Sequence, residues 1–119
     1  MARKGPTFEA LVATRVELLI EALGTATRVA ECLGVTRPLL SKWSAGMVMP
    51  TPAQAKLLVD LDHVVARGSL IYVPEIVNEW LFGHDSYLEG ARPIDVLHLR
   101  GVGDVLAALD SLEQTAWGG

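Results

Sequence analysis

Three histidines and a single cysteine are the residues of this chain with the greatest potential for metal binding or catalysis. His63, His84 and His98 are too scattered to match a metal-ligand spacing, and Cys32 has no obvious partner. Because Cys32 is the only cysteine, it cannot form an internal disulfide, and the sequence gives no indication that the protein folds in an oxidising compartment. The sequence therefore predicts no metal site.

Two further groupings could be imagined as catalytic. His84 stands beside Asp85, and His98 lies near Arg100. Solvated histidines on loops and helix surfaces are far more common than acid–base residues, so we give these pairs no catalytic role. Gly101-Val102-Gly103 lacks the strand that precedes a glycine-rich phosphate loop. We expect that the protein is not an enzyme and needs no cofactor.

Residues 36–42 carry side chains of the types that contact nucleic acids. The guanidinium of Arg37 matches the O6 and N7 acceptors of guanine, whereas Lys42 and Arg28 are suited to phosphate. If the two short helices described next form a DNA-binding unit, the residues expected to contact DNA are Arg28, Thr36, Arg37, Pro38, Ser41 and Lys42. The alternative for each of them is an ordinary solvated surface position.

A pair of short helices is needed to position these side chains. In VAECLGVTRPLLSKWSAG, residues 29–46, Ala30 is a small residue for a steep helix crossing and Gly34 turns the chain. Leu40 and Trp43 are apolar anchors that point inward from the second helix. The run is similar to the helix-turn-helix of phage-repressor and Xre-type regulators, a resemblance that covers roughly residues 8–67. A generic helical hairpin is the alternative.

This resemblance implies that the second short helix lies in the major groove of DNA. Charge favours the same half of the chain, because residues 1–50 hold six Arg or Lys against four Glu, a net charge of +2. Residues 51–119 hold four Arg or Lys against ten Asp or Glu, a net charge of −6. One copy with a net charge of +2 would bind DNA weakly, so we expect a homodimer.

Apolar spacing and capping residues predict helices along the rest of the chain. In the first helix, the residues from Leu11 to Leu23 at helical spacing form the predicted inner face. Asp85 or Ser86 is expected to cap a short turn that ends at Gly90. The predicted helices cover residues 8–23, about 26–33, 37 to near 46, from 52 onward, from 74 through 81, from 93, and about 102–115.

The segment WLFGHDSYLEGARPIDVLHLRGVGDVLAALDSLEQ, residues 80–114, is punctuated by glycine, proline, aspartate and leucine. Pro93 suits the first turn of a helix, and Asp95 is a carboxylate near that helix N-terminus. The order of these residues resembles the C-terminal toxin-binding domain of the Xre/MbcA/ParS antitoxins. With the helix-turn-helix, the resemblance covers nearly the whole chain.

The second resemblance implies a partner, because antitoxins of this family neutralise RES-domain toxins, enzymes that act on NAD, by laying their C-terminal part over the toxin's active-site entrance. They usually also bind their own operator DNA. The expected toxin-binding residues are Arg92, Leu109, Leu112, Glu113 and Trp117. The open alternatives are that Arg92 is a solvated charge and that Leu109 packs on its own domain.

The composition favours an all-α fold, because half of the residues are apolar and only 6% are aromatic. With 119 residues the chain forms one compact domain or two very small ones that share a core. We divide it into a DNA-binding region, residues 1–67, and a toxin-binding region, residues 68–119. The core of the first region is expected to lie before Gly68.

Glutamates at positions 17, 21 and 31 interrupt the N-terminal apolar residues, which argues against a membrane helix and against a signal peptide. The expected location is the cytoplasm. The leading hypothesis is a dimeric antitoxin that masks a RES-domain toxin and represses its own operator. The alternative is a free-standing dimeric repressor whose acidic half only dimerises or senses a ligand, and a RES-domain protein encoded by the adjacent gene would distinguish the two.

Overall fold

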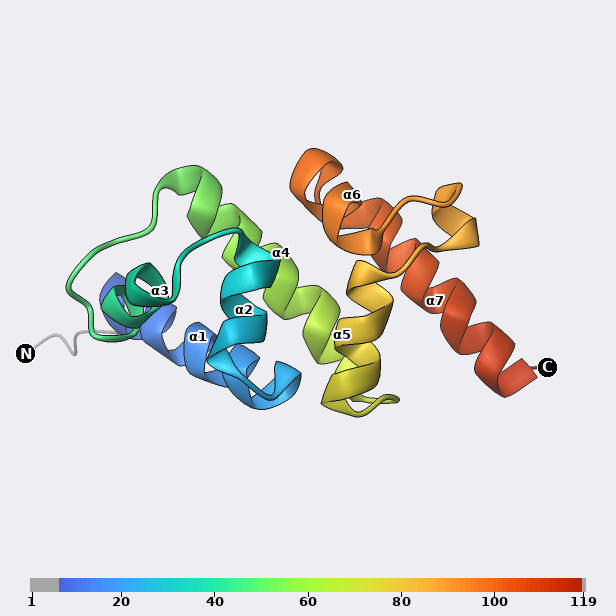
Figure 1. Cartoon of the computed structure of the whole chain (residues 1–119), viewed down its shortest axis with the longest axis horizontal. Helices are drawn as coiled ribbons and strands as arrows, with labels where there is room; N and C mark the ends of the chain where they lie inside the picture. The colour runs from blue at the N-terminus through green and yellow to red at the C-terminus, as the bar shows by residue number, and fades with distance from the viewer. Residues whose placement is uncertain (1–6, 119) are drawn as a thin grey trace, which may run out of the picture.

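The computed structural model describes residues 7–118, with side chains through Thr115, and within these limits it is all-α (Figure 1). The elements are α1 (Phe8–Leu23), α2 (Ala26–Leu33), α3 (Arg37–Ser44), α4 (Pro52–Ser69), α5 (Pro74–Phe82), a 3-10 turn η1 (Ser86–Leu88), α6 (Pro93–Arg100) and α7 (Gly103–Gly118). The predicted fold class is therefore confirmed.

Threonines begin the first four helices. The side chains of Thr7, Thr25, Thr36 and Thr51 each accept a hydrogen bond from the backbone N–H three residues on, at 3.1 to 3.2 Å. At α4 the Gln54 side chain also accepts from the backbone N–H of Thr51 at 2.9 Å, which completes a capping box. These local bonds satisfy N–H groups that have no partner within the helix, which explains why the sequence predicted the helix starts.

Gly68 lies in the last turn of α4, one residue before the helix ends. A β-carbon there would approach Cγ2 of Val77 on α5 to 3.4 Å, so the glycine allows the two helices to pack closely. A larger residue at this position would press against Val77.

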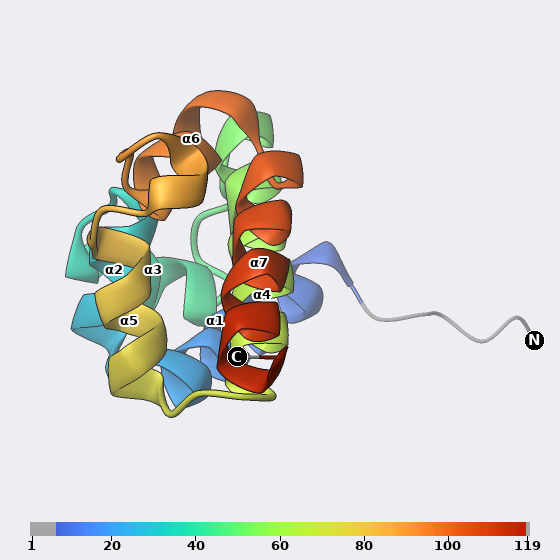
Figure 2. The same ribbon diagram turned by 90° about the vertical axis from the view of Figure 1, so that its right-hand side faces the viewer.

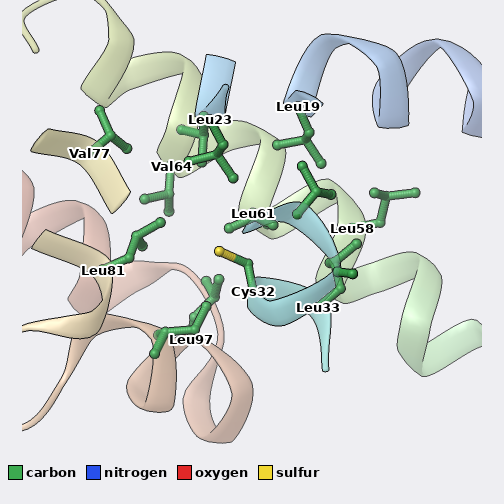
Figure 3. Packing of buried hydrophobic residues seen from close by; sticks show 14 of the residues in the cluster. Leu19, Leu23, Cys32, Leu33, Leu58, Leu61, Val64, Val77, Leu81 and Leu97 are labelled. Atoms are coloured by element: carbon green, nitrogen blue, oxygen red, sulfur yellow. The ribbon is translucent and has the colours of Figure 1, made fainter. Parts of the chain in front are cut away.

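The helices form one body in which α4 runs between the α1–α3 end and the α5–α7 end (Figure 1). Buried side chains from both ends join a single apolar cluster around Cys32 of α2 (Figure 3). Its labelled members from the two ends are Leu19, Leu23, Cys32, Leu33, Leu58, Leu61, Val64, Val77, Leu81 and Leu97.

A single core was expected for one compact domain and for two small units alike, and the described residues form one. This shared core corrects the expectation that the core of the first unit ends before Gly68, because Val77, Leu81 and Leu97 belong to the same cluster. The division after residue 67 falls within the last turn of α4, so it marks a predicted change of role and not a linker.

The predicted inner face of α1 is only partly correct. Val12, Val16, Leu19 and Leu23 are buried, but Leu11 is 48% exposed. The apolar arc of α1 is wider than the surface that the rest of the chain covers. Among the residues that the structure describes, no helix combines the length and apolar character needed to cross a membrane.

Candidate functional site

Helices α2 and α3 are joined by a tight turn that apolar residues hold in place. Ala30, Leu40 and Trp43 are at most 3% exposed, as the sequence predicted. Gly34 adopts a φ of +67°, a left-handed conformation that favours glycine, and the next N–H donates to Ala30 O at 3.0 Å. The inner face of the pair therefore belongs to the core, and its outer face is left to solvent.

The outer face of α3 brings five of the predicted DNA-contacting residues together. Thr36, Arg37, Pro38, Ser41 and Lys42 are all exposed and lie on the cap and the two turns of one helix. Thr36 also caps α3 through its hydroxyl. The structure thus presents Arg37 and Lys42 on a short polar surface that no described element covers.

Thr27 on α2 was not predicted as part of this surface. Arg37 Nη1 donates a hydrogen bond to Thr27 Oγ1 at 2.7 Å, which orients the guanidinium. Thr27 lies ten residues before Arg37, and only the crossing of the two helices brings them together. The sequence could have indicated this contact only through the presence of a hydroxyl residue in the first turn of the preceding helix.

Arg28 differs from the other predicted DNA-contacting residues, because its guanidinium is engaged within the chain. Arg28 Nη1 donates to Leu23 O at 2.8 Å and lies 3.9 Å from a carboxylate oxygen of Glu75 on α5. A phosphate contact by Arg28 would compete with these interactions. Lys42 is therefore the better candidate for a phosphate contact.

The segment between α5 and α6 is built around one carboxylate. Asp85 Oδ2 accepts a hydrogen bond from Trp80 Nε1 at 2.9 Å, and Oδ1 accepts from the backbone N–H groups of Tyr87 and Leu88 at 2.8 and 3.3 Å. This confirms Asp85 as the cap of the short turn. The turn ends at Leu88, earlier than expected, and Glu89 takes a φ of +58° before Gly90.

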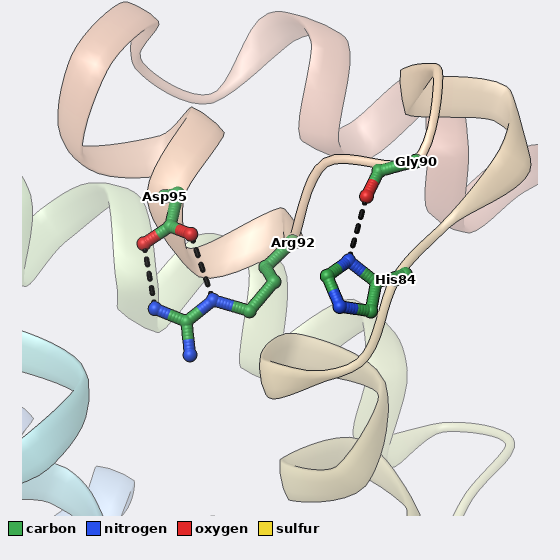
Figure 4. Close-up of polar contacts among 4 residues, drawn as sticks. All are labelled: His84, Gly90, Arg92 and Asp95. Carbon is green, nitrogen blue, oxygen red and sulfur yellow. Dashed lines mark hydrogen bonds and ion pairs between the residues drawn. The ribbon is translucent and has the colours of Figure 1, made fainter.

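Two further contacts shape the approach to α6 (Figure 4). His84 Nδ1 and Gly90 O form a hydrogen bond of 2.7 Å across the loop. Arg92 donates to both carboxylate oxygens of Asp95, at 2.7 and 2.9 Å, and its guanidinium carbon lies 5.7 Å from the centre of the Phe82 ring. These contacts close the loop onto the start of α6.

The Arg92–Asp95 pair also changes the acidity of both groups. The hydrogen bonds and the charge of Asp95 raise the pKa of Arg92, and the hydrogen bonds from Arg92 lower the pKa of Asp95. Both side chains are 40% exposed or more. Arg92 is therefore a partnered charge at the surface, still accessible to another molecule.

Helix α7 lies against α4 and contacts α6 and η1 (Figure 2). Leu109 is 2% exposed, so of the two alternatives that the sequence left open the structure has Leu109 packed on its own chain. Leu112 and Glu113 are half-buried, and a Glu113 carboxylate oxygen lies 3.9 Å from Arg67 Nη2 on α4. Arg67 also pairs with Asp110.

Leu112 and Glu113 are thus the predicted toxin-binding residues of α7 that reach the surface. The side chain of Trp117 lies outside the described residues. No hydrogen bond or ion pair in the described part of the chain joins Arg92 to α7.

The histidines and the cysteine take separate structural positions. His98 on α6 bonds through Nε2 to the backbone oxygen of Cys32 at 2.7 Å, which ties α6 to the end of α2. Burial raises the pKa of the Cys32 thiol to about 12, so it is a poor nucleophile near neutral pH. Within residues 7–115, no three His, Cys, Asp or Glu side chains cluster so that they could hold a metal ion.

The arrangement defines an all-α protein with one exposed polar helix at one end and a compact acidic unit at the other. A crystal structure of the Mycobacterium tuberculosis MbcT–MbcA toxin–antitoxin complex contains a chain of the same fold, with a TM-score of 0.73. The likeness covers 90% of this chain and 97% of that chain at 24% sequence identity, and it shows the fold alone.

Sequence comparison points to a particular kind of protein with that fold. The chain is 26% identical over 105 residues to the mycobacterial cidal antitoxin MbcA of Mycobacterium tuberculosis and of Mycobacterium bovis. The match spans 87% of this chain and 93% of each relative. No family model matches the chain. The similarity extends over nearly the full length of both proteins and supports an antitoxin of the MbcA type.

Proposed function

We propose that this chain is an antitoxin that neutralises a RES-domain, NAD-consuming toxin and represses its own operator as a homodimer. The observation that carries the proposal is the full-length similarity to MbcA antitoxins. The RES-domain partner is inferred from the glycine and proline punctuation of residues 80–114, whose predicted helices and turn are present in the fold. Operator binding is inferred from the α2–α3 pair.

For toxin binding, we propose that the exposed side of α7 and the residues after it cover the toxin's active-site entrance. Leu112 and Glu113 supply an apolar and a charged contact beside each other, and Trp117 would follow about one turn later. Leu109 supports this surface from within the core instead of contacting the toxin. Arg92 is proposed as a second contact, made from the start of α6.

For DNA binding, we propose that α3 enters the major groove. Arg37 is the candidate for base recognition, because its guanidinium is exposed and oriented by Thr27. Lys42 and Ser41, one turn later, would contact the phosphate backbone.

The test is co-expression with the protein encoded by the adjacent gene, followed by pull-down and a growth assay. The full chain is expected to bind that protein and to restore growth. A chain that lacks residues 115–119 keeps the buried part of α7 and should lose neutralisation. The matched control is Leu99→Glu, at a position that is 84% exposed on α6.

Rescue by the shortened chain would exclude masking through the end of α7. If the full chain binds operator DNA but no RES-domain protein, the free-standing repressor becomes the better description.

A further inference from the structure

The outer faces of α1 and α4 leave apolar side chains uncovered. On α1, Phe8, Leu11 and Leu18 are 52%, 48% and 51% exposed, although their spacing places them on one face of the helix. On α4, Val59 is 45% exposed on the face that borders α1. We use the name α1–α4 stripe for the following residues: Phe8, Leu11, Leu18, Ala55, Val59 and Ala66.

Two separate hollows border the α1–α4 stripe. One hollow, of about 160 Å³, is lined by Phe8, Leu11 and Val59 among others. The other, of about 650 Å³, lies between Leu18, Ala66 and the α4–α5 connection. Leu70 in that connection borders it and is itself 82% exposed, so a protruding apolar side chain stands beside an apolar hollow.

We propose that the α1–α4 stripe is the surface through which two copies of this chain associate. The inference rests on the proposed homodimer and names its interface. In a two-fold contact the same patch meets itself, so the exposed Leu70 of one copy can enter the larger hollow of the other.

The exposed side chains of the stripe supply a substantial part of the apolar area that such a contact needs. Its half-exposed Phe, Leu and Val side chains, together with Leu70, expose several hundred Å² of apolar surface, against about 800 Å² per partner in a standard interface. The largest apolar patch on a soluble protein is commonly of this size, and it is often a functional surface.

The charges on the stripe also favour a second copy. Arg15 lines the smaller hollow and Asp62 the larger one, and the two side chains pair with each other at 2.6 Å. Glu21 also lines the larger hollow. A nearly neutral patch can face itself without the repulsion that an excess of one charge would produce. It is unsuited to DNA, which requires positive charge.

The position of the stripe is compatible with both proposed binding activities. The residues that line the two hollows come from α1, α4, the α4–α5 connection and the start of α5. None of these lining residues belongs to α3 or α7, so a dimer formed there leaves the proposed DNA-binding and toxin-binding helices uncovered.

The experiment is sedimentation equilibrium of the full chain at micromolar concentrations. The unmodified chain is expected to be a dimer. Leu11→Glu and Val59→Lys, one on each helix, should each weaken dimerisation by roughly 30-fold or more, because each places a charge in the centre of an apolar contact. Both positions are about half exposed, so circular dichroism melting curves should show folded variants. The matched control, Leu99→Glu on α6, should remain a dimer.

A monomeric unmodified chain, or folded Leu11→Glu and Val59→Lys variants that dimerise normally, would overturn the inference. Loss of toxin binding by these variants, with a monomeric parent chain, would show that the stripe contacts the toxin instead. A third outcome is that the unmodified chain forms a dimer, that the two variants disrupt it, and that the chain binds no toxin. This would support the proposed dimer interface and contradict the proposed antitoxin function.

Discussion

The α2–α3 turn and the loop between α5 and α6 are both short and both end a helix, yet they are held in different ways. In the first, apolar anchors such as Leu40 and Trp43 face the core, and polar side chains remain on the outside. In the second, polar groups hold the loop itself. Asp85 accepts three hydrogen bonds, and Arg92 is bound to Asp95 at the start of α6.

In the α2–α3 pair, the residues that maintain the structure differ from those available for binding, whereas in the α5–α6 loop the same polar residues would serve both purposes. The outer residues of α3 can change without altering the inner face, so they are free to be selected for a ligand. In the α5–α6 loop the polar residues determine the shape, so their replacement changes structure before it changes binding. Stability and binding measurements on variants should therefore separate cleanly in the first region and not in the second.

The largest expected effect is from Trp43→Ala. Trp43 is 1% exposed, and truncation of a buried Trp costs about 3–5 kcal/mol of unfolding free energy. Because the core is shared, the loss should appear as one transition of the whole chain in chemical denaturation. Trp43→Phe should cost less, since no described residue accepts a hydrogen bond from the indole N–H. A native unfolding free energy for Trp43→Ala would contradict this position in the core.

The next effect is expected from Asp85→Ala. It removes the acceptor of three hydrogen bonds in the loop, and we expect a loss of about 2 kcal/mol by chemical denaturation. Ser86→Ala is the matched control, because no side-chain hydrogen bond of Ser86 is found among the described residues. Equal stabilities of the two variants would show that Asp85 does not hold the loop.

The features that the sequence predicted correctly are those that depend on residues close together in the chain. Helix starts at Thr7, Thr36 and Thr51 and the turn at Gly34 depend on neighbours within four residues, and they were predicted. The exposed and buried faces of α3 followed from the same local periodicity, so the candidate DNA surface was also assembled from sequence.

Contacts between distant elements were not predicted. The Arg67–Asp110 pair and the bond from Arg37 to Thr27 depend on how helices cross, which local patterns do not specify. Leu11 was placed inside, because its periodicity cannot tell a covered apolar face from one left for another molecule. The sequence allowed for a shared core, but it did not predict that Val77, Leu81 and Leu97 pack with the residues before Gly68.

A smaller effect, on binding alone, is expected from Arg37→Ala. If Arg37 contacts a guanine, its removal should weaken operator binding by about 1–3 kcal/mol and relax base preference at that position. Among the described residues its side chain bonds only to Thr27 at the surface, so stability should change little. Gel-shift titrations on operator and on altered operators measure both effects. Lys42→Ala is the comparison, since loss of a phosphate contact weakens binding to all sequences alike. Unchanged affinity and selectivity for Arg37→Ala would remove it from the recognition surface.

The smallest effect is expected from Asp95→Asn, and it should depend on pH. The pKa of Asp95 is lowered in the folded chain, so its contribution to stability is present above the unfolded carboxyl pKa of about 3.9 and is lost as pH falls through the lower folded value. The melting temperatures of the parent and of Asp95→Asn should therefore differ slightly at neutral pH and converge in acid. A difference that persists at the lowest pH would mean that the amide disturbs the loop by another route. Arg92→Gln should remove most of the pH-dependent part, because Asp95 then loses the partner that lowers its pKa most. If Arg92→Gln also weakens toxin binding while stability barely changes, Arg92 serves recognition more than shape, and the α5–α6 loop resembles α3 at this one position.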